Sequence, residues 1–141
     1  MSTDIDANVE AILRKYKTIT VVGASDAEEK PAHYVPEHMQ QHGWRIIPVN
    51  PRGGTILGQT AFSSLAQVPE RVGLVNVFRP SFQAPEIARQ AVAAGASALW
   101  LQLHLSSDEA RRIAEDAGLL YVENRCMLVE QRRLMLSAPT I

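Results

Sequence analysis

The fold is decided by the stretch Thr18-Ile-Thr-Val-Val-Gly23, a β-branched apolar run that ends in glycine. Residues of this kind are enriched in strands, and a run that is apolar at nearly every position is typical of a strand buried in a parallel sheet. Gly23 allows a tight turn after the run. We therefore predict a strand at residues 18–23 whose carboxyl end opens into a loop.

Similar runs recur along the chain, at residues 45–50, 73–78, 98–102 and 119–123. Helical patterns separate them, each followed by a glycine that suits a helix terminus, at residues 31–42, 85–94 and 108–117. Two more helices are expected at residues 5–16 and 125–134. Strand–helix alternation predicts an α/β fold: a Rossmann-like, doubly wound, parallel five-stranded sheet with strand order 3-2-1-4-5. Pro48 cannot donate a ladder hydrogen bond, so we expect it near the end of its strand or at a distorted position.

Length and composition predict a single domain over residues 1–141, with residues 1–17 forming a helix packed on it. The net charge is −1 and no lysine-rich run occurs, so neither nucleic acid nor an anionic membrane is an expected partner. The lone cysteine, Cys126, fits a reducing compartment. No signal peptide or membrane-spanning stretch is recognised, so a cytoplasmic location is expected.

The loop after the first strand, residues 23–31, is a candidate phosphate site because ligands of open parallel sheets bind beyond the carboxyl ends of the strands. Gly23 and Ala24 leave room for a phosphate, and Ser25 adds a hydroxyl donor. Lys30 adds charge beside Pro31, which suits the first turn of an anion-binding helix. The loop lacks the full Gly-x-Gly-x-x-Gly spacing, and an ordinary strand-to-helix turn is the alternative.

The loop after the second strand carries Asn50, Pro51 and Arg52. An NAD site places an acid at the end of this strand to bind the ribose, whereas this chain has Asn50 followed by a cation. Arg52 suits a phosphate, so the sequence permits NADP or coenzyme A (CoA) and argues against NAD. A turn with a solvated arginine is the alternative.

The remaining strands bring further candidates to the same edge. Val77, Phe78 and Arg79 end the third strand, and the apolar pair could flank an adenine or a pantetheine arm. Gln102 ends the fourth, followed by His104. Asn124, Arg125 and Cys126 follow the fifth.

No catalytic centre emerges from the residue pattern. The sequence shows no recognisable Ser/His/acid motif and no paired carboxylates at strand ends. His38 and His42 are four residues apart, as in some metal sites, but no matching third ligand appears, and we expect both on an exposed helix face. Cys126 beside Arg125 is interpreted either as a core residue or as a thiol of lowered pKa.

Several blocks together resemble a known family. They are Val21-Val-Gly-Ala-Ser25, Lys30-Pro31, Gly43-Trp-Arg-Ile-Ile-Pro-Val-Asn-Pro51, Val75-Asn-Val-Phe-Arg79, Leu99-Trp-Leu-Gln102 and Asn124-Arg-Cys126. The chain resembles the small stand-alone CoA-binding domain proteins of bacteria, whose fold is shared by the N-terminal domain of the succinyl-CoA synthetase alpha subunit.

The resemblance implies a Rossmann fold that binds CoA or acyl-CoA. Gly23, Ala24, Ser25 and Lys30 would lie near phosphates. Asn50, Pro51 and Arg52 would surround the adenosine end, with Val77, Phe78 and Arg79 beside it, and Gln102 would lie near the pantetheine path. The chain departs from the family at His33 and Tyr34, where relatives often carry small or basic residues. The ligase's catalytic histidine lies in a different domain, so the resemblance implies binding and no ligase catalysis.

Two other functions stay open on the sequence. One is a small NADP-dependent oxidoreductase with Arg52 on the 2′-phosphate. The other is a nucleotide-binding interaction protein whose pocket has become vestigial.

Overall fold

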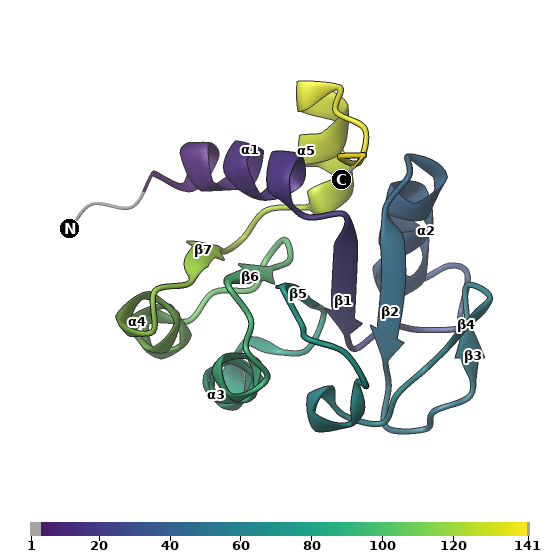
Figure 1. The fold of residues 1–141 in the computed structure, drawn as a ribbon, viewed down its shortest axis with the longest axis horizontal. Helices are drawn as coiled ribbons and strands as arrows, with labels where there is room; N and C mark the ends of the chain where they lie inside the picture. The colour runs from purple at the N-terminus through teal and green to yellow at the C-terminus, as the bar shows by residue number, and fades with distance from the viewer. Residues whose placement is uncertain (1–3, 141) are drawn as a thin grey trace.

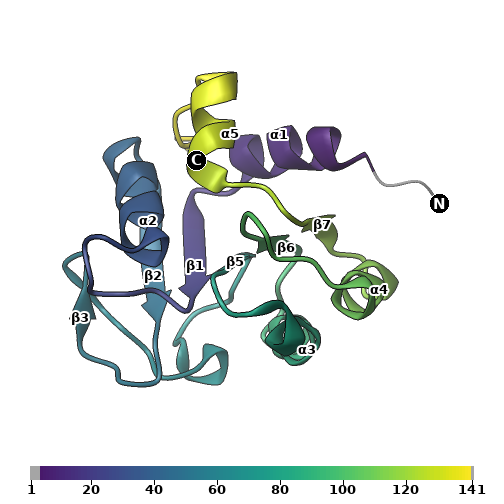
Figure 2. The same cartoon turned by 180° about the vertical axis from the view of Figure 1, so that it is seen from behind.

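The β-branched runs form one parallel sheet. The computed structural model describes residues 4–140, and within them the sheet has the strand order β2-β1-β5-β6-β7. The strands are β1 (Thr18–Val22), β2 (Arg45–Val49), β5 (Leu74–Val77), β6 (Ala98–Leu101) and β7 (Leu120–Val122). Their arrowheads show that β1 and β2 end on the same side of the molecule (Figures 1 and 2).

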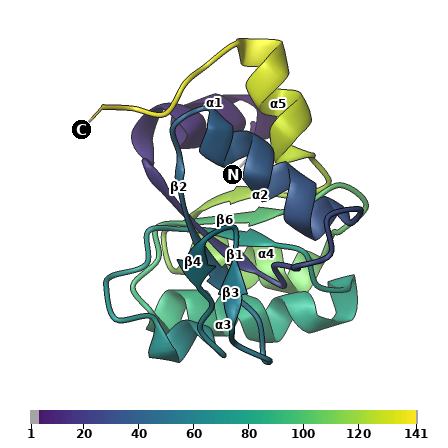
Figure 3. The same ribbon diagram turned by 90° about the vertical axis from the view of Figure 1, so that its right-hand side faces the viewer.

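Five helices in the described residues cover the two faces of the sheet. They are α1 (Ile5–Lys15), α2 (Pro31–Gln41), α3 (Ala84–Ala93), α4 (Asp108–Asp116) and α5 (Met127–Leu134). The view along the sheet places α1, α2 and α5 on one face and α3 and α4 on the other (Figure 3). Every helix and strand predicted from the sequence is present to within two residues at each end.

Local sequence explains where the helices begin. Asp4 and Ser107 accept hydrogen bonds from the N–H groups of Ala7 and Ala110, at 3.2 and 3.0 Å. Such N-caps satisfy donors that the first helical turn leaves without partners. Pro31 occupies the first turn of α2, where its missing N–H costs nothing.

The core lies in two layers because successive side chains of a strand point to opposite faces. Val21 packs in the layer under α1, α2 and α5, whereas Val22 packs in the layer over α3 and α4. Both faces are therefore buried, which explains why the strands are apolar at nearly every position.

The predicted strand order was wrong. The third predicted strand, β5, pairs with β1 and not with β2, so the order is 2-1-3-4-5. The outer side of β2 carries a short hairpin, β3 (Thr55–Ile56) and β4 (Gln59–Thr60), and a single parallel bridge from Val49 to Phe62. These residues occupy the edge where another long strand would pair. The order therefore reverses between β1 and β5, and a ligand crevice is expected at that reversal.

Pro48 fits this edge. It is the fourth residue of the five in β2, as expected near a strand's end, and its carbonyl accepts a hydrogen bond from the N–H of Phe62 at 3.0 Å. The missing N–H of Pro48 points to the same outer side, so the pairing of β2 with β1 is unaffected.

No helix in the described part of the chain is long and apolar enough to cross a membrane.

Candidate ligand-binding site

A pocket of about 580 Å³ lies at the carboxyl edge of the sheet, between the loops that follow β1, β2 and β5. It brings together nine of the eleven residues predicted from the sequence: Gly23, Ala24, Ser25, Lys30, Asn50, Pro51, Arg52, Phe78 and Arg79. The two exceptions are Val77 and Gln102. We call this cavity the basic pocket because three of its lining residues, Lys30, Arg52 and Arg79, are cations.

The loop after β1 starts at Gly23, where a side chain does not fit. Its φ is +92°, and an added Cβ would lie 2.9 Å from Cδ of Arg79 and 3.3 Å from the backbone carbon of Phe78. The N–H of Gly23 donates to the carbonyl of Val49 at 3.0 Å. Glycine therefore lets the loop pass close under Arg79 while it continues the pairing with β2.

Free backbone donors line the basic pocket. The N–H groups of Ala24, Asp26 and Ala32 donate to no protein acceptor in residues 4–140. Ser25 differs, because its N–H donates to the carbonyl of Ala32 and its Oγ accepts from the N–H of Ala27 at 3.0 Å. The Ser25 hydroxyl proton is still available to a ligand. Unpaired N–H groups beside the start of α2 favour an anion.

The side chain of His33 hydrogen-bonds to the loop after β1. Its ring is buried, with 8% of the residue exposed, and its Nδ1 lies 2.8 Å from the backbone oxygen of Ser25. A carbonyl only accepts, so Nδ1 carries the proton and donates. Sequence reasoning identified His33 only as a departure from the family pattern, because nothing in the residue order indicates a bond from the first turn of α2 back to Ser25.

The loop after β2 is organised by Asn50. Its Nδ2 donates to the carbonyl of Ala24 at 2.8 Å, and its Oδ1 accepts from the N–H of Arg52 at 2.8 Å. The second bond is the local turn that asparagine favours. Asn50 therefore joins the two loops that form the pocket and fixes the backbone at Arg52.

The charges of the pocket favour an anionic ligand. The side chains of Lys30 and Arg52 make no ion pair and no hydrogen bond with residues 4–140, and both residues are exposed. Arg79 donates from Nε to Oε1 of Gln83 at 3.1 Å. Asp26 is the single carboxylate among the residues that line the pocket. Guanidinium groups and free N–H donors fit the oxygens of a phosphate, so the residues present suit a phosphorylated ligand.

Val77 and Gln102 lie outside the basic pocket. Val77 is fully buried in the sheet. Gln102 is 5% exposed, and its Oε1 accepts from the N–H of Met127 at 3.3 Å and from Nδ2 of Asn76 at 3.5 Å. These contacts join the end of β6 to the start of α5, which is a supporting role.

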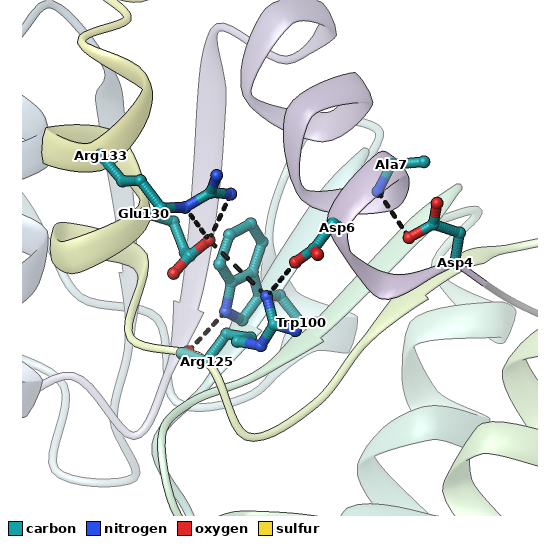
Figure 4. Close-up of polar contacts among 7 residues, drawn as sticks. All are labelled: Asp4, Asp6, Ala7, Trp100, Arg125, Glu130 and Arg133. Atoms are coloured by element: carbon teal, nitrogen blue, oxygen red, sulfur yellow. Dashed lines mark hydrogen bonds and ion pairs between the residues drawn. The ribbon is translucent and has the colours of Figure 1, made fainter.

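The Arg125 side chain is directed at the carboxylates of Asp6 and Glu130 (Figure 4). Arg125 is not among the residues that line the basic pocket. Its Nη1 lies 2.6 Å from Oδ1 of Asp6 and 3.7 Å from Oε1 of Glu130, and its carbonyl accepts from Nε1 of Trp100 at 2.8 Å. The hydrogen bond from Arg125 lowers the pKa of the Asp6 carboxyl. The neighbouring Cys126 precedes α5 and is half-buried. The Arg125 charge is therefore matched by carboxylates.

The predicted exposure of His38 and His42 was wrong, since both are half-buried. Nε2 of His38 lies 2.6 Å from Oε1 of Gln131, and Nδ1 of His42 lies 2.8 Å from the carbonyl of His38. His38 therefore joins α2 to α5, whereas the His42 ring bonds back within α2. Among residues 4–140, no three His, Cys, Asp or Glu side chains are grouped so that they could hold a metal ion.

The sequence and the fold match a known class of proteins. The model of the CoA binding domain family matches residues 17–132, and the chain belongs to that family. The Rossmann-like fold and the resemblance found in the sequence are thereby confirmed.

Three relatives show how far the similarity extends. The uncharacterized protein YneT of Bacillus subtilis is 36% identical over 129 residues, which cover 92% of this chain and 96% of YneT. The solved structure of a hypothetical protein from Pyrococcus horikoshii superposes with a TM-score of 0.87 at 35% identity, covering 93% of this chain and 92% of that one. The ADP-forming acetate–CoA ligase II of Archaeoglobus fulgidus is 27% identical over 101 residues, covering 70% of this chain and only 15% of the ligase.

Proposed function

We propose that this protein binds CoA or an acyl-CoA in the basic pocket. The observation that carries the proposal is the grouping of three cations with three free backbone N–H groups at the strand-order reversal, in a chain that belongs to the CoA binding domain family. CoA carries a diphosphate and a 3′-phosphate, and such groups require this kind of donor set.

Each part of the pocket has a role in the proposal. The N–H groups of Ala24, Asp26 and Ala32, with Lys30, bind the diphosphate, because free donors at the start of a helix favour anions. Arg52 pairs the 3′-phosphate, and Asn50 holds the backbone from which Arg52 extends. The proposal is one of binding and includes no reaction of the bound thioester or thiol.

Thermal unfolding with a panel of nucleotides tests the proposal. Wild-type protein is heated with CoA, acetyl-CoA, dephospho-CoA, NADP, NAD and ATP at equal concentrations. A ligand at 100 times its Kd stabilises the folded state by about 2.7 kcal/mol, so binding appears as a clear rise in Tm.

The expected order has CoA and acetyl-CoA above all the others. NADP would produce the largest rise if the protein were an oxidoreductase with Arg52 on a 2′-phosphate. No rise with any ligand would indicate a pocket that no longer binds nucleotides. Either result would overturn the proposal.

A further inference from the structure

The direction of one free donor in the loop after β1 is set by the ring of His33. Nδ1 of His33 donates to the backbone oxygen of Ser25 at 2.8 Å, and no peptide bond in the described residues is cis. In a trans peptide the C=O and the next N–H point in opposite directions. The bond to His33 therefore turns the N–H of Asp26 away from the ring, and this N–H has no protein acceptor in residues 4–140.

The His33 ring lies behind the loop and not in the basic pocket. Ser25 and Asp26 line that pocket, whereas His33 does not, and only 10% of the His33 side chain is exposed. A side chain in this place acts on a ligand through the peptide that joins Ser25 to Asp26. Ring, carbonyl, N–H and ligand anion then form a chain of hydrogen bonds, in which each bond polarises the next.

The second nitrogen of the ring faces a carboxylate. Nε2 of His33 lies 4.0 Å from Oε2 of Glu37, one helical turn further along α2, and 45% of the Glu37 side chain is exposed. At this distance the neutral ring makes no hydrogen bond with Glu37. A proton taken up from solvent at Nε2 would make the ring cationic and turn this contact into an ion pair.

No other carboxylate competes for the ring. In the described part of the chain, Glu37 supplies the only carboxylate within 4.0 Å of a His33 ring nitrogen. The helix that packs against α2 is α5, and its Glu130 is already paired with Arg125 and Arg133, at 3.7 and 2.9 Å. The remaining titratable groups on α2 and on the elements packed against it are Asp26, Glu28, Glu29 and Lys30 in the loop, His38 and His42 on α2, Arg45 on β2, Cys126 before α5 and Arg132 on α5.

We propose that His33 couples the uptake of one proton to the binding of the ligand's diphosphate; the inference rests on the proposed function. The cationic ring donates more strongly to the Ser25 carbonyl, which makes the N–H of Asp26 a stronger donor to a phosphate oxygen. Such linkage is reciprocal, so a bound anion also favours the proton on the ring. An imidazole is the side chain suited to change charge between pH 5 and 8, and the affinity therefore rises as the pH falls across this range. His33 is a positioning residue, because it acts through Ser25 and not on the ligand directly.

Dephospho-CoA is the probe that isolates this effect. The 3′-phosphate of CoA is a monoester that loses its second proton at about pH 6, so its own titration would obscure that of the protein. Dephospho-CoA keeps the diphosphate and has no phosphate monoester. A change in its affinity between pH 5.5 and pH 8 therefore reports on the protein.

Calorimetric titration of wild type and of His33 variants tests the coupling. His33→Asn keeps a side-chain N–H close to the position of Nδ1 but cannot take up a proton, whereas His33→Leu removes the donor. Wild-type affinity for dephospho-CoA should rise roughly 5- to 10-fold from pH 8 to pH 5.5, because a neutral hydrogen bond becomes a charge-assisted one. His33→Asn should match wild type at pH 8 and lack this rise, and His33→Leu should bind more weakly at both pH values. His42→Asn is the matched control, because it makes the same exchange at the other end of α2 and should keep the rise.

Proton uptake can also be counted directly. Titrations at pH 6.5 in PIPES and in imidazole, two buffers with different enthalpies of ionisation, give the number of protons taken up per ligand bound. Wild type should take up a measurable fraction of one proton and His33→Asn none. Glu37→Gln removes the carboxylate that faces Nε2 and should take up fewer protons than wild type. Its side chain is 45% exposed, so this variant keeps the inference testable if the buried His33 variants fail to fold.

The outcomes distinguish the two proposals. If wild type and His33→Asn take up the same number of protons and share one pH dependence, His33 only supports the loop; the inference is then wrong and the proposed function stands. If the His33 variants unfold, unchanged proton uptake in Glu37→Gln overturns the inference and reduced uptake supports it. If wild type binds neither CoA nor dephospho-CoA at any pH, the proposed function fails and this inference fails with it.

Discussion

The side-chain amide of Asn50 donates a hydrogen bond to the main-chain carbonyl of Ala24 across 2.8 Å. This bond joins the loops after β2 and β1, which form most of the basic pocket. The same side chain accepts from the N–H of Arg52. Asn50, which is uncharged, therefore holds both the loop after β1, with its free N–H groups, and the backbone of Arg52 in the loop after β2.

Asn50→Asp should lower both stability and affinity for CoA. The carboxylate keeps an acceptor for the N–H of Arg52 but places an oxygen against the carbonyl of Ala24, where a donor is required. The expected loss is about 1–2 kcal/mol in the free energy of unfolding, measured by urea denaturation. Asn50→Ala is the uncharged control. If the added charge matters for the ligand, the aspartate substitution weakens CoA more than the alanine substitution, and equal affinities would contradict this.

Gly23→Ala should disturb the pocket through Arg79. The added Cβ would lie 2.9 Å from Cδ of Arg79, at a φ of +92° that side chains rarely adopt. Gly58→Ala is the matched control, because Gly58 has a φ of +75° with nothing within 4 Å of the added Cβ.

Both substitutions carry the strain of a positive φ, so their difference isolates the crowding at Gly23. Gly23→Ala should lose roughly 1–3 kcal/mol more than Gly58→Ala in urea denaturation, as overpacked sites do. It should also weaken CoA, because Arg79 must move. Equal losses of stability would show that the loop adjusts without cost.

Arg52→Ala should discriminate between CoA and dephospho-CoA. The Arg52 side chain makes no hydrogen bond or ion pair with the described residues and lines the basic pocket. Charge-assisted hydrogen bonds contribute about 1.5–3 kcal/mol, so CoA affinity should fall roughly tenfold or more while dephospho-CoA affinity falls much less. Arg132→Ala removes the same charge from an exposed position on α5 and should change neither. Equal losses of affinity for CoA and dephospho-CoA would show that Arg52 does not bind the 3′-phosphate.

The ion pair between Arg45 and Glu70 predicts a pH-dependent stability. Nη1 and Nη2 of Arg45 donate to the two carboxylate oxygens of Glu70 at 2.7 and 2.8 Å, and these bonds lower the pKa of Glu70 below its usual 4.5. A lowered pKa contributes stability above the ordinary pKa, and this stability is lost as the pH falls through the lowered one.

Glu70→Gln should therefore cost less than about 1 kcal/mol at pH 7, since the pair is at the surface. The difference from wild type should vanish in strong acid. Urea denaturation at pH 7 and pH 3 measures it, with Glu29→Gln as the control, because Glu29 has no ion pair among the described residues. A cost that is the same at both pH values would show that the ion pair contributes nothing.

Local pattern predicted the elements well but not their order. The apolar runs and the glycines after the helices specify each strand and helix through the backbone of a few neighbouring residues. Strand order depends on which runs pair at long range, and β5 has the same apolar character whether it lies beside β1 or β2. In the structure the hairpin formed by β3 and β4 and the bridge from Val49 to Phe62 occupy the outer side of β2, where β5 was expected to pair. Neither feature has a strong pattern in the sequence.

The same limit applies to the site. The rule that ligands bind at carboxyl strand ends correctly grouped Gly23, Asn50 and Arg79, because a parallel sheet brings strand ends together. The rule could not show that the His33 ring hydrogen-bonds to the backbone oxygen of Ser25, or that the Phe82 side chain stays exposed. Those facts follow from how a helix and a turn pack, and the residue types alone are ordinary for their positions.

Gln102 follows the end of β6, and a substitution there asks whether this residue contacts the ligand or only supports the fold. The family resemblance implies that Gln102 lies near the pantetheine path. In the structure its Oε1 accepts from the buried N–H of Met127 and from Nδ2 of Asn76. Gln102→Met keeps the length of the side chain and removes that acceptor. The expected loss is about 1–3 kcal/mol in the free energy of unfolding, because buried donors are left unpaired.

Ligand affinity then separates the two roles of Gln102. If Gln102 only supports α5, Gln102→Met should change the affinities for CoA and for adenosine 3′,5′-bisphosphate by the same factor, because any disturbance reaches both through the fold. If the pantetheine arm passes Gln102, CoA should weaken while the bisphosphate is unaffected. Because the Gln102 side chain is 5% exposed and does not line the basic pocket, we expect calorimetric titration to show the same fold change in affinity for both ligands. A loss of affinity for CoA alone would show that Gln102 contacts the pantetheine arm. The arm would then have to pass beside Met127.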